Sequence, residues 1–136
     1  MSLTIDANVL VRIIVEDNVE EALVARNQVA DAQSVIVPLV ALCETNWVLK
    51  SVYKLGRAER VSVIKELLRT RKIVLDRPAV EAGLVMLEAG GDFADGVIAF
   101  DGARLGGETF ATFDRRAADL LLKSGHDCRL LAAQSR

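Results

Sequence analysis

The sequence has few of the side chains that most often carry acid–base or nucleophilic catalysis. Its 136 residues include one histidine and two cysteines. His126 has no acid, base or metal ligand spaced to assist it, so we assign it to a surface loop. Cys43 and Cys128 lie in separate apolar runs, as buried thiols of a reducing compartment do. A Ser-His-Asp triad and a His/Cys zinc site are therefore excluded, and any chemistry has to use carboxylates.

The sequence also lacks long hydrophobic runs. None approaches the roughly 18 residues that a membrane helix needs, and no basic region followed by an apolar segment marks a secretory signal. We therefore expect a cytoplasmic protein without a membrane segment. An apolar content of 51% with 26% charged residues is ordinary for a folded domain. The length predicts one domain spanning residues 1–136.

Short apolar strands alternate with helical patterns along the chain. This alternation predicts right-handed crossovers and a parallel sheet covered on both faces. The expected fold is α/β, a three-layer α/β/α sandwich with a parallel sheet of about five strands. The strands are expected at 3–5, 34–37, 73–75, 109–112 and 128–131, and the helices at 8–15, 18–32, 39–53, 57–71, 78–89, 92–105 and 115–123.

Positive charge is concentrated in residues 50–77, which hold nine basic and three acidic side chains in a chain of net charge −2. Two sets of basic residues have spacings that would place each set on one helical face. Such faces are usually only solvated, but they can also hold nucleic-acid phosphates near an acidic site. Both interpretations stay open for the two sets, which are Lys50, Lys54 and Arg57, and Lys65, Arg69 and Lys72.

Three aspartates stand where strands end or helices begin. Asp6 follows the first expected strand, Asp114 follows the fourth, and Asp95 lies in a first helical turn behind Asp92. Each has an ordinary explanation as a helix cap or a partner of the helix dipole. However, the carboxyl ends of parallel strands are also where ligands collect in open α/β sheets.

Glu44 interrupts an apolar helical stripe, because Val40, Ala41, Trp47 and Val48 lie three or four residues away. A buried carboxylate needs a basic partner or a metal. No lysine or arginine lies within four residues of it, although a more distant ion pair stays possible. We therefore favour a functional role for Glu44.

Together these acids predict a metal site. Carboxylates that converge without histidine or cysteine repel one another unless a cation intervenes. Hard oxygen donors suit Mg²⁺ or Mn²⁺, and such ions can activate a water for phosphodiester cleavage. Asn8 and Thr112 are placed to orient the carboxylates or their waters. The residues thus predict metal-dependent phosphoryl-transfer chemistry without naming a substrate.

Four motifs, in this order and spacing, resemble PIN-domain nucleases, and most closely the VapC-type toxins of bacterial type II toxin–antitoxin pairs. The resemblance spans nearly the whole chain. The motifs are Asp6-Ala7-Asn8-Val9-Leu10-Val11-Arg12, Leu42-Cys43-Glu44-Thr45-Asn46-Trp47-Val48-Leu49, Asp92-Phe93-Ala94-Asp95-Gly96-Val97-Ile98-Ala99 and Thr112-Phe113-Asp114.

The resemblance implies a Mg²⁺- or Mn²⁺-dependent endoribonuclease that hydrolyses RNA with a metal-activated water. It further implies a homodimer and a cognate VapB-type antitoxin whose C-terminal tail blocks the site. Two residues depart from the family pattern. Ala7 stands where a hydroxyl residue is usual, and Gly96 stands where alanine is common, which would loosen the turn beneath Asp95. The implied metal-binding and catalytic residues are Asp6, Glu44, Asp95 and Asp114, with Asp92 acidic in many relatives.

Other classes of protein share some of these features. A non-catalytic metal- or RNA-binding module of the same fold would keep the carboxylates without turnover, and a PIN nuclease outside toxin–antitoxin systems would keep the chemistry. A phosphotransfer domain with an aspartate nucleophile would need an Asp-x-Asp motif after the first strand. The segment Asp6-Ala7-Asn8 does not supply that motif.

Overall fold

A computed structural model describes residues 1–133 of the chain. The chain divides into two compact units, an N-terminal unit, Met1–Arg77, and a C-terminal unit, Pro78–Arg136. The expected α/β class is confirmed, with seven helices and five strands in residues 1–133. Every element falls within two residues of its expected bounds. The strands form a three-stranded and a two-stranded sheet, and all the strand pairs are parallel.

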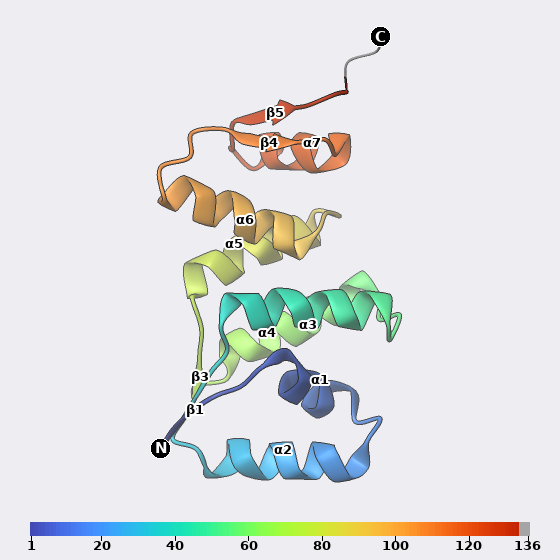
Figure 1. Cartoon of the computed structure of the whole chain (residues 1–136), viewed down its shortest axis with the longest axis vertical. Helices are drawn as coiled ribbons and strands as arrows, with labels where there is room; N and C mark the ends of the chain where they lie inside the picture. The colour runs from blue at the N-terminus through green and yellow to red at the C-terminus, as the bar shows by residue number, and fades with distance from the viewer. Residues whose placement is uncertain (134–136) are drawn as a thin grey trace. The chain divides into compact units, whose positions relative to one another are not determined.

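The N-terminal unit contains the three-stranded sheet, in which the strand order is β1-β2-β3. Leu3 pairs with Val35, which in turn pairs with Ile73. The helix α1 contacts both α2 and α3, and Figure 1 shows it between them. The elements in chain order are β1 (Ser2–Thr4), α1 (Ala7–Val15), α2 (Val19–Asp31), β2 (Ser34–Ile36), α3 (Leu39–Ser51), α4 (Arg57–Arg69) and β3 (Ile73–Val74).

Local signals in the sequence start these helices. Asn18 caps α2, because its side-chain oxygen accepts a hydrogen bond from the backbone N–H of Glu21 at 3.0 Å. Pro38 stands directly before α3, where its missing N–H costs no helical hydrogen bond. Leu10 and Leu42 are among the side chains buried in the core of the unit.

One buried polar contact joins α3 to α4. Arg60 is 5% exposed, and its guanidinium donates to the Asn46 side-chain oxygen at 3.2 Å and to the Leu55 carbonyl at 3.2 Å. Asn46 is buried as well. A buried charge of this kind is tolerated because its N–H groups find acceptors.

The C-terminal unit contains the two-stranded sheet, in which Phe110 pairs with Cys128. Its core is formed by Met86, Ala99, Ala117 and Leu121. Figure 1 shows α7 beside β4 and β5 in this unit. The elements are α5 (Arg77–Glu88), α6 (Phe93–Arg104), β4 (Phe110–Thr112), α7 (Arg115–Lys123) and β5 (Cys128–Leu130).

Glycine allows α5 and α6 to approach each other closely. A Cβ atom on Gly96 would lie 2.7 Å from the Ala82 carbonyl oxygen and 2.9 Å from the Gly83 Cα. Both are backbone atoms, so a side-chain rotation cannot relieve the clash. Gly96 therefore makes the close contact of the two helices possible, and its effect on the first turn of α6 stays a prediction.

The structure also bears on the predictions for the two cysteines and for membrane segments. Cys43 and Cys128 are free thiols, but both are partly exposed rather than buried. Among residues 1–133, every helix is too short or too polar to cross a bilayer.

Candidate functional site

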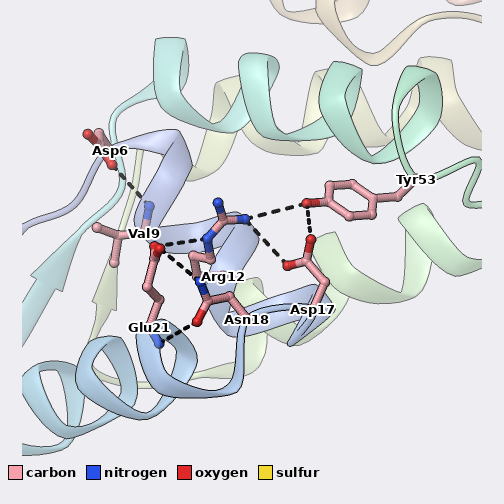
Figure 2. Close-up of polar contacts among 7 residues, drawn as sticks. All are labelled: Asp6, Val9, Arg12, Asp17, Asn18, Glu21 and Tyr53. Atoms are coloured by element: carbon pink, nitrogen blue, oxygen red, sulfur yellow. Dashed lines mark hydrogen bonds and ion pairs between the residues drawn. The ribbon is translucent and has the colours of Figure 1, made fainter.

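Asp6 lies between β1 and α1. Its Oδ1 atom accepts a hydrogen bond from the Val9 backbone N–H at 3.0 Å, so it caps α1 (Figure 2). The side chain is exposed. The capping bond uses one carboxylate oxygen and leaves the other for a ligand.

Glu44 lies on the exposed face of α3, so the prediction that it interrupts a buried apolar stripe is wrong. The helix instead buries a face that contains two polar residues. Thr45 donates its hydroxyl to the Ala41 carbonyl at 2.8 Å, and Asn46 accepts from Arg60. The buried residues of α3 are Ala41, Leu42, Thr45, Asn46 and Leu49.

The fold of the N-terminal unit brings Asp6 and Glu44 to the same two cavities. A cavity of about 220 Å³ is lined by both acids together with Asn8 and Arg12. A second cavity, of about 440 Å³, is lined by both acids and by Pro38. Two carboxylates that are 38 positions apart in the sequence thus share one surface region.

Arg12 is a charged residue of this region that the sequence patterns did not single out. Its Nε donates to Glu21 Oε2 at 3.0 Å, and its Nη1 lies 3.4 Å from both Asp17 Oδ1 and the Tyr53 hydroxyl (Figure 2). The Tyr53 hydroxyl donates to Asp17 Oδ2 at 2.8 Å. The hydrogen bonds with Glu21 and then Tyr53 raise the pKa of Arg12 above its usual value. Its partners lie 5, 9 and 41 residues away, beyond the reach of a helical-spacing argument.

The C-terminal unit holds the other acids at two helix starts. Asp92 caps α6 by accepting from the Ala94 N–H at 3.2 Å, and Asp114 caps α7 by accepting from the Ala117 N–H at 3.1 Å. Asp95 lies half-buried in the first turn of α6.

Burial raises the pKa of Asp95 above its usual value, and the negative charges of Asp92 and then Asp114 raise it further. The negative charges of Asp92 and Asp114 thus act on Asp95, while convergence of the four predicted acids stays a prediction. Thr112 supports this group, since its hydroxyl oxygen accepts a hydrogen bond from the Asp114 backbone N–H at 3.0 Å.

The candidate acids have no basic partner among the residues that the structure describes. Some other acids of the chain are paired, for example Glu16 with Arg26 and Asp101 with Arg104. By contrast, within residues 1–133 no lysine or arginine forms an ion pair with any candidate acid. The acids without such a partner are Asp6, Glu44, Asp92, Asp95 and Asp114.

The donor chemistry of these acids fits a hard divalent cation, because every group is a carboxylate and none is neutralised by a base. No group of three or more His, Cys, Asp or Glu side chains in the described part of the chain is arranged to hold a metal ion. Of the four predicted acids, Asp6 and Glu44 belong to the N-terminal unit, and Asp95 and Asp114 belong to the C-terminal unit.

The prediction that each of the two basic sets lies on one helical face is wrong. Lys50 lies in α3, Lys54 lies in the following turn with a φ of 57°, and Arg57 begins α4. Similarly, α4 ends at Arg69, so Lys72 lies outside the helix of the second set.

Some basic residues of the segment have structural contacts instead. Arg60 is buried between α3 and α4. The Lys72 ammonium donates to the Val29 carbonyl at 2.8 Å and to the Ala30 carbonyl at 3.2 Å, near the end of α2. Binding of nucleic acid by Lys50, Lys54 and Arg57 stays a prediction.

Unpaired carboxylates on an α/β scaffold define a candidate site for a divalent metal ion. A family model for the PIN domain matches residues 3–120, and the chain belongs to the PIN-domain family. PIN domains are generally metal-dependent nucleases that bind nucleic acid. Comparison with curated proteins gives no match.

Proposed function

We propose that the chain is an endoribonuclease that depends on Mg²⁺ or Mn²⁺ and acts as the toxin of a toxin–antitoxin pair. Family membership supports nuclease chemistry in general. The choice of RNA and the toxin role rest on the order and spacing of the four motifs, which resemble VapC-type toxins.

One observation carries the proposal. All four predicted acids fall into groups that the fold assembles from distant parts of the sequence, Asp6 with Glu44 and Asp95 with Asp114. None of the four forms an ion pair with a basic side chain in residues 1–133. Asp95 is in addition half-buried beside two other acids, which disfavours its charged form, and a role in cation binding gives this arrangement a physical reason.

In this proposal Asp6, Glu44, Asp95 and Asp114 hold the metal ion. When bound, the ion supplies positive charge that lowers the pKa of a water and stabilises the leaving oxygen of the phosphodiester.

The chain's own residues prepare that site. Asp6 keeps its orientation through the capping bond to Val9, and Thr112 fixes the backbone at Asp114. Asn8 lines the smaller cavity beside Asp6, where its amide can orient a carboxylate or a water. Asp92 adds negative charge next to Asp95, which strengthens the attraction for a cation.

The proposal also includes a cytoplasmic homodimer that is controlled by a VapB-type antitoxin. Resemblance of the motifs to VapC-type toxins supports both features. Lys50, Lys54 and Arg57 are the proposed contacts to RNA phosphates. Their positions at the end of α3, in the following turn and at the start of α4 leave them close together along the chain.

The test is a cleavage assay on single-stranded RNA with purified protein. We expect activity that EDTA removes and Mn²⁺ restores, and that is lost in Asp6→Asn with the fold intact. The same assay on single-stranded DNA defines the substrate class. Metal binding without cleavage of either substrate would contradict the proposal and favour a non-catalytic binding module.

A further inference from the structure

A row of three exposed side chains runs along α3. Glu44, Trp47 and Lys50 are three residues apart, so they lie on neighbouring positions of one helical side. All three are exposed, and Trp47 is 62% exposed. The row places the Glu44 carboxylate, the Trp47 indole ring and the Lys50 ammonium next to one another.

Trp47 is the only tryptophan of the chain, and it is not one of the buried residues of α3. The core of the N-terminal unit forms from the opposite side of α3, where Leu42 and Leu49 are each 1% exposed. An indole ring left in water loses the favourable burial of a large apolar surface. A ligand that covers the ring would recover that free energy.

Lys50 is likewise available to a ligand. It is exposed and forms no ion pair within the part of the chain that the structure describes. One step along the row takes the helix forward by about 4.5 Å. Aromatic rings and cations are the two elements with which proteins bind single-stranded nucleic acid, by base stacking and by phosphate contact.

We propose that Trp47 stacks on a base of single-stranded RNA while Lys50 contacts a neighbouring phosphate, so that the row on α3 holds the strand beside Glu44. This inference rests on the proposed function, because it assigns the RNA strand to the same side of α3 as a proposed metal ligand. It also specifies the form of the substrate, since the bases of a duplex are stacked on one another and leave no free face.

The charges of the row favour RNA over a second copy of the protein. Glu44 stands between Val40, which is 80% exposed, and Trp47. A protein interface that covered both apolar side chains would also bury this carboxylate without a partner, which is costly. Single-stranded RNA would instead place a base on Trp47 and a phosphate at Lys50 without burying Glu44.

The single tryptophan provides a direct readout of binding. Fluorescence of Asp6→Asn is recorded in EDTA while unstructured single-stranded oligoribonucleotides of mixed sequence are added, so that neither metal nor turnover contributes. We expect quenching by single strands and none by a duplex of the same sequence. Unchanged emission at single-strand concentrations that saturate binding in an anisotropy assay would overturn the inference.

Activity measurements separate stacking from a structural effect. Trp47→Ala should raise KM for single-stranded RNA about 10-fold with little change in kcat, and Trp47→Phe should keep most of the affinity. Leu23→Ala is the matched control, because Leu23 is 59% exposed on α2 and should leave KM unchanged. An unchanged KM in Trp47→Ala would overturn the inference while leaving the nuclease proposal intact.

Dilution of the RNA-free protein tests whether a second copy of the protein covers the row on α3. Emission from Trp47 that shifts on dilution, together with a change in oligomeric state, would mean that a second copy covers the row and would overturn the inference. Absence of metal-dependent cleavage in the wild type would instead contradict the proposed function, which the quenching experiment does not depend on.

Discussion

Asp6 in the N-terminal unit and Asp95 in the C-terminal unit both stand at the start of a helix, but their surroundings differ. Asp6 is exposed, caps α1 and shares a cavity with the cation of Arg12. Asp95 is half-buried, and burial first and then the negative charges of Asp92 and Asp114 raise its pKa. The charged form of Asp95 is therefore disfavoured by its surroundings, whereas Asp6 lies in solvent beside a cation.

The same contrast extends to helix packing. In the N-terminal unit a buried polar contact between Arg60 and Asn46 joins two helices. In the C-terminal unit α5 and α6 meet at Gly83 and Gly96 with no room for another carbon atom. A substitution at Asn46 would therefore destabilise the N-terminal unit by removing a hydrogen bond, whereas a substitution at Gly83 or Gly96 would destabilise the C-terminal unit by adding atoms that do not fit.

The largest expected effect is on cleavage. Asp6→Asn and Asp95→Asn should each lower kcat/KM for RNA by more than about 100-fold, because each removes a proposed metal ligand, and even supporting residues of metal sites cost 10- to 100-fold. The assay is cleavage of RNA in Mn²⁺, with circular dichroism to verify folding. Full activity in either folded variant would remove that residue from the site.

Gly96→Ala should destabilise the C-terminal unit by about 1–3 kcal/mol, because the added Cβ meets backbone atoms of α5. Gly102→Ala is the control in the same helix, since nothing lies within 4 Å of its added Cβ. That control should stabilise the protein by about 0.5–1 kcal/mol. Urea unfolding measures both, and equal effects of the two substitutions would contradict the tight contact of α5 with α6.

Asp95→Asn should raise the melting temperature in EDTA at neutral pH by about 2 °C, because it removes a partly buried charge and its repulsion with Asp92 and Asp114. Since the folded-state pKa of Asp95 is raised, the protonated wild-type carboxyl is favoured in the folded state, and stability is lost as pH rises through that pKa.

The advantage of Asp95→Asn should therefore vanish as pH falls to the unfolded-state pKa of aspartate. Asp6→Asn is the comparison from the other unit. Asparagine caps a helix about as well as aspartate, so the melting temperature should change little. A drop in the Asp95→Asn melting temperature at neutral pH would contradict the repulsion among the three acids.

The smallest effect concerns the contacts around Arg12. Tyr53→Phe removes the hydroxyl that accepts from Arg12 and donates to Asp17. These contacts lie near solvent, so the free energy of unfolding, measured in urea, should fall by about 0.5–1 kcal/mol. A loss of cleavage activity without this small destabilisation would show that Tyr53 serves the reaction rather than the position of Arg12.

The sequence predicted the elements well because their signals are local. Asn18, Pro38, Asp92 and Asp114 all stand at helix starts as their types favour. Hydrophobic periodicity failed for α3, where Thr45 and Asn46 are buried with partners while Val40 and Trp47 are exposed. Helical spacing predicts which residues share a face, but hydropathy alone chose the wrong face of α3 as the buried one.

Contacts between residues far apart in the sequence could not be predicted from sequence patterns. The partners of Arg12 and the acceptor of Lys72 depend on how helices pack, and the close contact at Gly96 depends on an α5 residue 13 positions earlier. The places of Asp6, Asp95 and Asp114 at helix starts were predictable from local signals, whereas Glu44 was selected by a burial argument that the structure contradicts. Their lack of basic partners became visible only in the structure.

The central claim is that Asp6, Glu44, Asp95 and Asp114 are ligands of a divalent cation. The most direct measurement is Mn²⁺ binding, followed by calorimetry, to the wild type, Asp6→Asn and Asp95→Asn. We predict that the wild type binds Mn²⁺ and that each substitution, in either unit, weakens binding at least 10-fold. Binding that is unchanged in one of the two variants would remove that acid from the proposed set of metal ligands and contradict the account.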